Sequence, residues 1–249
     1  LSSEEATGRQ IELGAQRQDQ SRNRPVHDRS SETISTSLEF ERVIDDICNL
    51  SWESIGEEEV LRVALAYYYF SIQFRESLEI TCCLYPNDTR LDLLRRGECN
   101  TSNLSPWEGV ATVGEEMNHD EFMRRLLALQ PLPDASSIVE AGLQYLNLAR
   151  NTDNMTRAKS IASYEDGGLE RVFSAMLRAP SWHGSGQRAF KFFLEQHIKF
   201  DSNDVDGHGA LCRHIPVDDS ILPLWAAFLD LLRSSVAAFA ARETDSNCR

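Results

Sequence analysis

The residues best placed to do chemistry are a histidine and an aspartate four positions apart, His197 and Asp201, followed by His208 in an Asp-Gly-His-Gly stretch. Residues four apart on a helix share one face, so the imidazole of His197 and the carboxylate of Asp201 are predicted to point the same way. Two imidazoles and one carboxylate form a ligand set that suits non-haem Fe(II). The same segment also fits a polar helix face that runs into a turn, and taken alone it does not separate the two interpretations.

Three further residues could complete such a site, namely Glu98, His119 and Glu165. Glu165 lies in an otherwise apolar helical stretch, where a carboxylate needs a partner or a shifted pKa. Glu98 follows a predicted helix and His119 opens the next, although a solvated glutamate and a capping histidine are the ordinary explanations for each alone. Together the six residues supply three carboxylates and three imidazoles. That is enough for two adjacent iron ions with a bridging carboxylate and open positions for O2, whereas a single zinc ion needs only four ligands.

Composition limits the classes of protein to which the chain can belong. The net charge of −14 makes nucleic acid and anionic membrane surfaces poor partners. No apolar run approaches the roughly 18 residues of a membrane span, and the first residues are too polar for a secretory signal. The six cysteines form no CxxC pair, so we expect reduced thiols in a cytoplasmic protein.

The hydrophobic pattern predicts one all-α domain. Residues 1–36 are polar and are expected to be disordered, residues 37–242 form a helical bundle, and residues 243–249 form a tail. Helical spacing predicts seven or eight helices, at about 38–50, 57–83, 89–98, 121–129, 135–150, 155–178, 185–201 and 221–241. The irregular stretch 100–114 contains proline, glycine and tryptophan, and we expect it to loop out and cover a substrate cavity.

The order of the six candidate ligands resembles that of the haem-oxygenase-like diiron oxidases. Residues 118–129 are similar to the second ligand helix of that family, residues 163–169 to the third, and the similarity extends over roughly residues 40–240. The resemblance implies an all-α fold shared with haem oxygenase and thiaminase-type proteins. It also implies two Fe(II)/Fe(III) ions held by the six residues, with O2 as cosubstrate.

Within that family, the strings at 97–107 and 200–214 look most like the branch that includes the azetidine-forming enzyme of polyoxin-type nucleoside antibiotic biosynthesis. That branch implies removal of hydrogen from a small aliphatic amino acid such as isoleucine or valine, followed by desaturation or C–N ring closure. An arginine would bind the substrate carboxylate, and the candidates are Arg75, Arg96 and Arg213. An external electron donor and a homodimer are compatible with this interpretation.

The sequence departs from the family pattern in two places. Its final histidine lies seven residues after Asp201, where the family places it two or three residues on. Either the helix is interrupted there, or Asp204 or Asp206 takes a ligand role instead of His208. The separation of Glu98 from His119 is too long for one short helix. Three alternatives stay open: a metal-free thiaminase-type hydrolase that uses Cys82 or Cys83 with Glu165, haem binding with His119 or His197 as the axial ligand, and a non-catalytic helical binding protein.

Overall fold

The computed structural model describes residues 38–99, 104–201 and 207–240, without the side chains of Cys99, Phe200, Asp201 and Ala240. The described residues are helical and contain no strand, only one isolated bridge between Trp107 and Ala111. The prediction of a single all-α domain is therefore confirmed for this part of the chain. The expected disorder of residues 1–36 and the tail at 243–249 lie outside the described residues.

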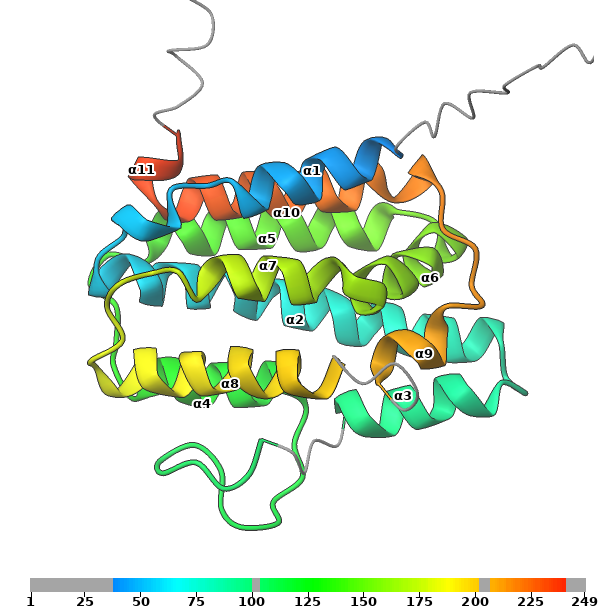
Figure 1. The fold of residues 1–249 in the computed structure, drawn as a ribbon, viewed down its shortest axis with the longest axis horizontal. Helices are drawn as coiled ribbons and strands as arrows, with labels where there is room; N and C mark the ends of the chain where they lie inside the picture. Colours follow the sequence, from blue (N-terminus) through cyan, green and yellow to red (C-terminus); the bar gives the residue numbers. More distant parts are fainter. Residues whose placement is uncertain (1–37, 100–103, 202–206, 241–249) are drawn as a thin grey trace, which may run out of the picture. The chain divides into compact units, whose positions relative to one another are not determined.

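The longest helix, α2 (Glu57–Leu84), lies at the centre of the bundle and contacts α3, α4, α5, α6, α8 and α10 (Figure 1). It begins with three glutamates, which suit the positive end of a helix dipole, and the carboxylate of Glu59 accepts a hydrogen bond from the Gly56 amide at 2.7 Å. It ends just before Pro86, which cannot continue a helix. The remaining helices are α1 (Glu39–Cys48), α3 (Thr89–Cys99), α4 (His119–Ala128), α5 (Ser136–Asn151), α6 (Asn154–Ser163), α7 (Leu169–Met176), α8 (Ser185–Asp201), α9 (His208–Cys212), α10 (Leu222–Ser235) and α11 (Ala237–Ala240).

Aromatic side chains fill the centre of the core around Tyr67 of α2. Its ring lies within 6.5 Å of the rings of Phe173, Phe193 and Phe228, measured between centroids, so it joins α2 to α7, α8 and α10. These rings are buried. The aromatic residues of α2 thus belong to the core, and the helices that carry the candidate ligands are fixed by apolar packing.

The structure divides the chain into more helices than the hydrophobic pattern predicts. The helix expected over 155–178 is interrupted by a π-helical segment at Tyr164–Gly168, hereafter the π segment, in which Gly167 has a φ of 91°. A positive φ costs glycine little, and it bends the chain between α6 and α7. The short helix α9 occupies part of the predicted glycine-rich turn, and the helix expected over 221–241 is broken at Val236, which is extended. Among the described residues, no helix has both the length and the apolar character needed to cross a membrane.

Candidate metal centre

Five of the six predicted ligands come together where α3, α4, α8, α9 and the π segment meet. Their side chains form two overlapping groups, and within each group the potential ligand atoms lie within 4.8 Å of one another. In Figure 1, α9 lies beside α3 and near the end of α8, and the contacts of α9 with α3 and α8 and of α4 with α8 agree. Residues far apart in the sequence thus converge at one place, as a metal centre in a helical bundle requires.

The first group consists of Glu98, His119 and His197. The Nδ1 atom of His119 lies 2.7 Å from Glu98 Oε2 and 3.4 Å from His197 Nε2. Nδ1 of His197 lies 2.7 Å from the carbonyl oxygen of Phe193, one turn earlier on α8. A donor to that carbonyl must carry its proton on Nδ1, which leaves Nε2 with a lone pair that faces the group. Backbone orientation of this kind is typical of metal-binding histidines.

The second group consists of Glu98, Glu165 and His208. Nδ1 of His208 lies 2.6 Å from Glu98 Oε1 and 3.2 Å from Glu165 Oε2. Glu98 therefore belongs to both groups, with one carboxylate oxygen directed to each. A carboxylate in this position could contribute a ligand atom to each group.

All five side chains are buried, and burial together with their neighbours shifts the pKa values of Glu98, Glu165, His197 and His208. Burial raises the pKa of the Glu98 carboxyl, but the charges and hydrogen bonds of His119 and His208 outweigh it and hold that pKa well below its usual range. For Glu165, burial raises the pKa more than contact with His208 lowers it. The pKa of Glu98 is thus lowered and that of Glu165 is raised, although both carboxylates face the imidazole of His208.

The two histidines of α8 and α9 also differ. Burial and the neighbouring His119 lower the pKa of His197 to about 3, so its ring is neutral and able to bind a metal ion at pH 7. Burial lowers the pKa of His208, but Glu98 and Glu165 outweigh burial and raise it well above the ordinary value. In the metal-free protein the charge of Glu98 is therefore balanced by a proton on His208, and a metal ion bound there would replace that proton.

The donor set fits a metal ion. His119 Nε2 is buried and makes no hydrogen bond within the described part of the chain, although buried polar atoms are almost always satisfied. The surroundings are two carboxylates and three imidazoles, which are ligands that divalent transition metals accept. These residues could hold metal ions.

Close backbone approach fixes α9 against its neighbours. A Cβ at Gly209 would lie 2.9 Å from the carbonyl oxygen of Glu165, so only glycine lets α9 approach the π segment this closely. A Cβ at Gly97 of α3 would lie 3.1 Å from Nε2 of His208, so α3 also lies close to the His208 ring. These two glycines bring His208 between Glu98 and Glu165.

The other predicted site residues have different outcomes. Asp201 ends α8, but its side chain, like residues 202–206 with Asp204 and Asp206, lies outside the described residues. The guanidinium groups of Arg75 and Arg213 make ion pairs with Asp120 at 3.0 Å and with Asp166 at 2.8 Å. Their predicted contact with a substrate carboxylate stays a prediction.

The loop that follows residues 100–103 packs against α4 and α8. Trp107 stacks on Phe192 with 4.6 Å between ring centroids, and Arg125 donates to the carbonyl of Val110 at 2.9 Å. A pocket of about 650 Å³ lies beside this loop, lined by Pro106, Trp107, Glu108, Gly109, Leu129, Ser185 and Arg188. None of the five clustered ligands lines it, so the loop as cover of a substrate cavity stays a prediction.

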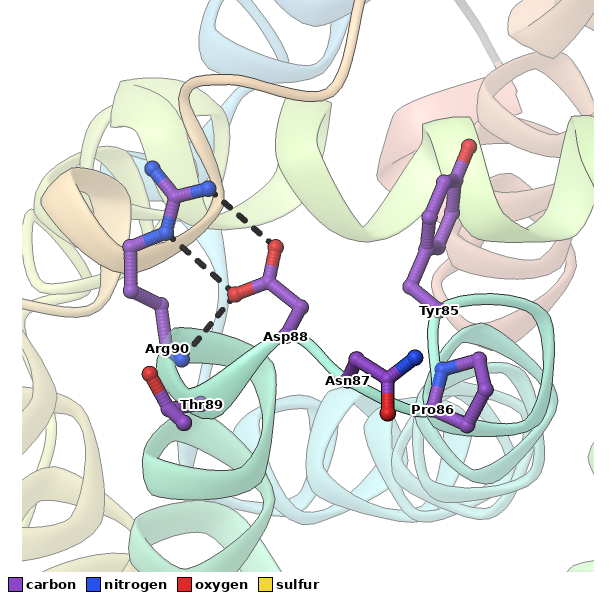
Figure 2. A pocket seen from close by; sticks show the side chains of 6 residues that line it. All are labelled: Tyr85, Pro86, Asn87, Asp88, Thr89 and Arg90. Atoms are coloured by element: carbon purple, nitrogen blue, oxygen red, sulfur yellow. Dashed lines mark hydrogen bonds and ion pairs between the residues drawn. The ribbon is translucent and has the colours of Figure 1, made fainter.

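A second surface pocket follows the turn from α2 to α3 and is lined by residues 85–90 (Figure 2). Its centre is the carboxylate of Asp88, which accepts hydrogen bonds from the backbone and side chain of Arg90. The Nε2 atom of His214 lies 2.6 Å from the same carboxylate. Neither Asp88 nor His214 carries a sequence signal that predicts this pairing, because it depends on how α9 packs against α3.

The thiols give no support to a cysteine nucleophile. The Sγ atom of Cys82 lies 3.6 Å from the carbonyl of Leu91, and burial raises the pKa of this thiol. A nucleophilic cysteine needs the opposite shift. Cys83 is exposed and free.

Comparison with protein-family models, with curated proteins and with solved structures finds no match for this chain.

Proposed function

We propose that this protein is a non-haem diiron oxidase of the haem-oxygenase-like type, which uses O2 to oxidise a small molecule. The observation that carries the proposal is the position of Glu98, whose two oxygens face His119 and His208 in two separate groups of buried ligands. A structural zinc site uses four ligands around one ion, often cysteines. A shared carboxylate with imidazoles on either side instead favours a pair of iron ions.

The two groups assign the ligands to the two ions. Glu98, His119 and His197 would hold one ion, and Glu98, Glu165 and His208 the other, with Asp201 as a further candidate from the end of α8. Iron bound there would supply electrons to O2 and the oxidising strength needed to remove hydrogen from an aliphatic carbon. The protein contributes burial, which excludes water, and Phe193, whose carbonyl orients His197 and whose ring lies 4.1 Å from the imidazole.

The substrate that we propose is a small aliphatic amino acid, oxidised by desaturation or by C–N cyclisation to an azetidine in natural-product biosynthesis. Reduction of O2 to two molecules of water takes four electrons and four protons. Desaturation or ring closure releases two of each from the substrate. The other two electrons would come from the two Fe(II) ions in a first turnover, and an external donor would return the iron to Fe(II) for the next. The resemblance of 97–107 and 200–214 to the azetidine-forming branch supports this choice.

Anaerobic titration of the metal-free full-length chain with Fe(II), followed by exposure to O2 with a panel of amino acids, tests the proposal. We expect about two iron ions per chain, in line with two ligand groups, and O2 consumption that depends on one class of amino acid. His197→Ala and Glu165→Ala should each lose iron, whereas His183→Ala, which changes an exposed histidine paired with Glu57, should not. A wild-type chain that binds no iron, or full loading of both variants, would overturn the diiron assignment.

Three other outcomes decide between the alternatives. A Soret band on addition of haem would favour a haem protein. Hydrolysis of a substrate by the iron-free protein would favour a thiaminase-type enzyme. Iron binding without O2 consumption by any amino acid would favour a non-catalytic metal-binding protein.

A further inference from the structure

Helix α9, which carries His208, is too short to be stable without contacts from other parts of the chain. Helix α9 has five residues, and isolated helices shorter than about 12 residues are marginal in water. Its position relative to Glu98 and Glu165 must therefore come from tertiary contacts. The two residues that follow it, Arg213 and His214, make such contacts in two directions.

Arg213 ties α9 to the π segment. Its Nε and Nη2 atoms donate to the same oxygen of Asp166, Oδ1, at 3.0 and 2.8 Å. Asp166 follows Glu165 directly, and its ψ of 58° and the positive φ of Gly167 mark the kink of the π segment. The ion pair therefore joins the backbone next to one ligand, Glu165, to the end of the helix that carries another, His208.

His214 ties α9 to α3. Its Nε2 atom lies 2.6 Å from Asp88 Oδ2. The carboxylate of Asp88 is itself held by the amide and the guanidinium of Arg90, in the first turn of α3 (Figure 2). Helix α3 carries Glu98 near its other end. The contact thus joins α9 to the helix that supplies the shared carboxylate.

We propose that Arg213 and His214 are positioning residues, which hold α9 between α3 and the π segment so that His208 faces both Glu98 and Glu165. We call this pair of contacts the α9 clasp. It gives Arg213 a role different from binding of the substrate carboxylate. The placement of α9 by the clasp is independent of iron, whereas its consequence for metal binding rests on the proposed function.

Cys212 is a native probe of α9 that needs no metal. It is the last residue of the helix and fully buried, and its Sγ lies 3.4 Å from the carbonyl of His208. In the metal-free full-length chain, alkylation by iodoacetamide can be followed for each cysteine by peptide mass spectrometry. Partly exposed ion pairs are individually weak, so loss of both in Arg213→Ala/His214→Ala should speed alkylation of Cys212 by roughly fivefold or more.

Cys48, which is half-buried on α1, reports on unfolding of the rest of the domain. The matched control is Arg150→Ala/His183→Ala, which also removes an arginine and a histidine that pair with glutamates, Glu76 and Glu57. The clasp predicts faster labelling of Cys212 alone, in the clasp variant alone. Unchanged labelling of Cys212, or an equal rise for Cys48, would overturn the proposal.

Iron binding then tests the consequence for the site. We expect about two Fe(II) per wild-type chain, whereas Arg213→Ala/His214→Ala should bind its second Fe(II) roughly fivefold or more weakly, because the clasp positions His208, a ligand of the second group only. The single variant Arg213→Lys, which keeps the charge and leaves His214 in place, should bind Fe(II) close to the wild-type level. A second Fe(II) bound as tightly by the double variant as by the wild type would contradict a positioning role, and weaker amino-acid binding in that case would assign Arg213 to the substrate. If the wild type binds no iron, the proposed function fails, and the labelling of Cys212 still decides whether the clasp exists.

Discussion

The imidazole of His208 lies against the carboxylate of Glu98, with 2.6 Å between Nδ1 and Oε1. Glu165 faces the same nitrogen from the other side at 3.2 Å. The pKa of Glu98 is nevertheless lowered and that of Glu165 is raised, because Glu98 also contacts His119. The same chemical change at the two carboxylates should therefore have opposite effects on the metal-free protein.

Glu98→Gln should remove metal binding altogether and destabilise the metal-free chain. The shared carboxylate belongs to both ligand groups, so both ions should be lost. Loss of one partner from a buried charge pair costs about 3–5 kcal/mol of unfolding free energy, and the contact of Glu98 with His208 is of that kind. Fe(II) titration and urea unfolding in EDTA at pH 7 measure the two effects. Glu79→Gln, at an exposed position of α2, is the control, and a variant that still binds two ions would exclude Glu98 as the bridge.

Glu165→Gln should reduce binding to about one Fe(II) and stabilise the metal-free chain at pH 8. A carboxyl with a raised pKa in the folded state stabilises the fold at pH values below its unfolded pKa, and this contribution is lost as the pH rises through the folded pKa. The neutral amide of glutamine avoids that loss. Melting temperatures in EDTA should therefore rise at pH 8 and match the wild type at pH 4. A lower melting temperature at pH 8 would show that the Glu165 charge is stabilising.

The sequence predicts much of this arrangement because helical periodicity is strong on amphipathic helices. The expected spans 57–83 and 185–201 match α2 and α8 closely. Glu165 could be singled out because a carboxylate within apolar residues needs a partner. Five of the six predicted ligands come together, and the sixth, Asp201, lies at the edge of the described residues.

The remainder depends on tertiary contacts that leave no periodic signal. The π segment interrupts a continuous helical pattern in the sequence. Its kink at Gly167 lies two residues after Glu165, which contacts His208. Helix α9 is one turn long in a glycine-rich stretch that reads as a turn. Which carboxylate is shared between the two groups also depends on three-dimensional placement, and spacing along the chain could not have identified Glu98.

Gly97→Ala should separate metal binding from stability. Alanine is favoured over glycine within a helix by about 1 kcal/mol, so the change should not lower the melting temperature of the metal-free protein greatly. Its Cβ would lie 3.1 Å from Nε2 of His208, and that ring must shift to make room. We expect Fe(II) binding to fall from two ions to about one. Leu93→Ala, at an exposed position of the same helix, should bind iron like the wild type, and full loading of Gly97→Ala would show that His208 has room to move.

Acid should destabilise the metal-free protein through His197. Its pKa is lowered from 6.5 to about 3 in the folded state, chiefly by burial. Between these values the unfolded chain binds a proton that the folded chain does not, so the stabilisation is complete above pH 6.5 and is lost as the pH falls. One proton corresponds to about 1.4 kcal/mol of unfolding free energy per pH unit.

His197→Leu removes the proton-binding group and keeps an apolar side chain, so it isolates this contribution. Urea unfolding in EDTA between pH 6.5 and pH 5 should show a steeper loss of unfolding free energy for the wild type, by about 1–2 kcal/mol over that interval. The ordinary pKa of a glutamate is 4.5, and folding lowers the pKa of Glu98 below that value. Between pH 6.5 and pH 5 its carboxylate is therefore mostly ionised in both the folded and the unfolded chain, and it adds little to the difference in unfolding free energy. Equal slopes for the two proteins would mean that the His197 ring takes up its proton without unfolding, and that the lone pair of Nε2 is open to solvent.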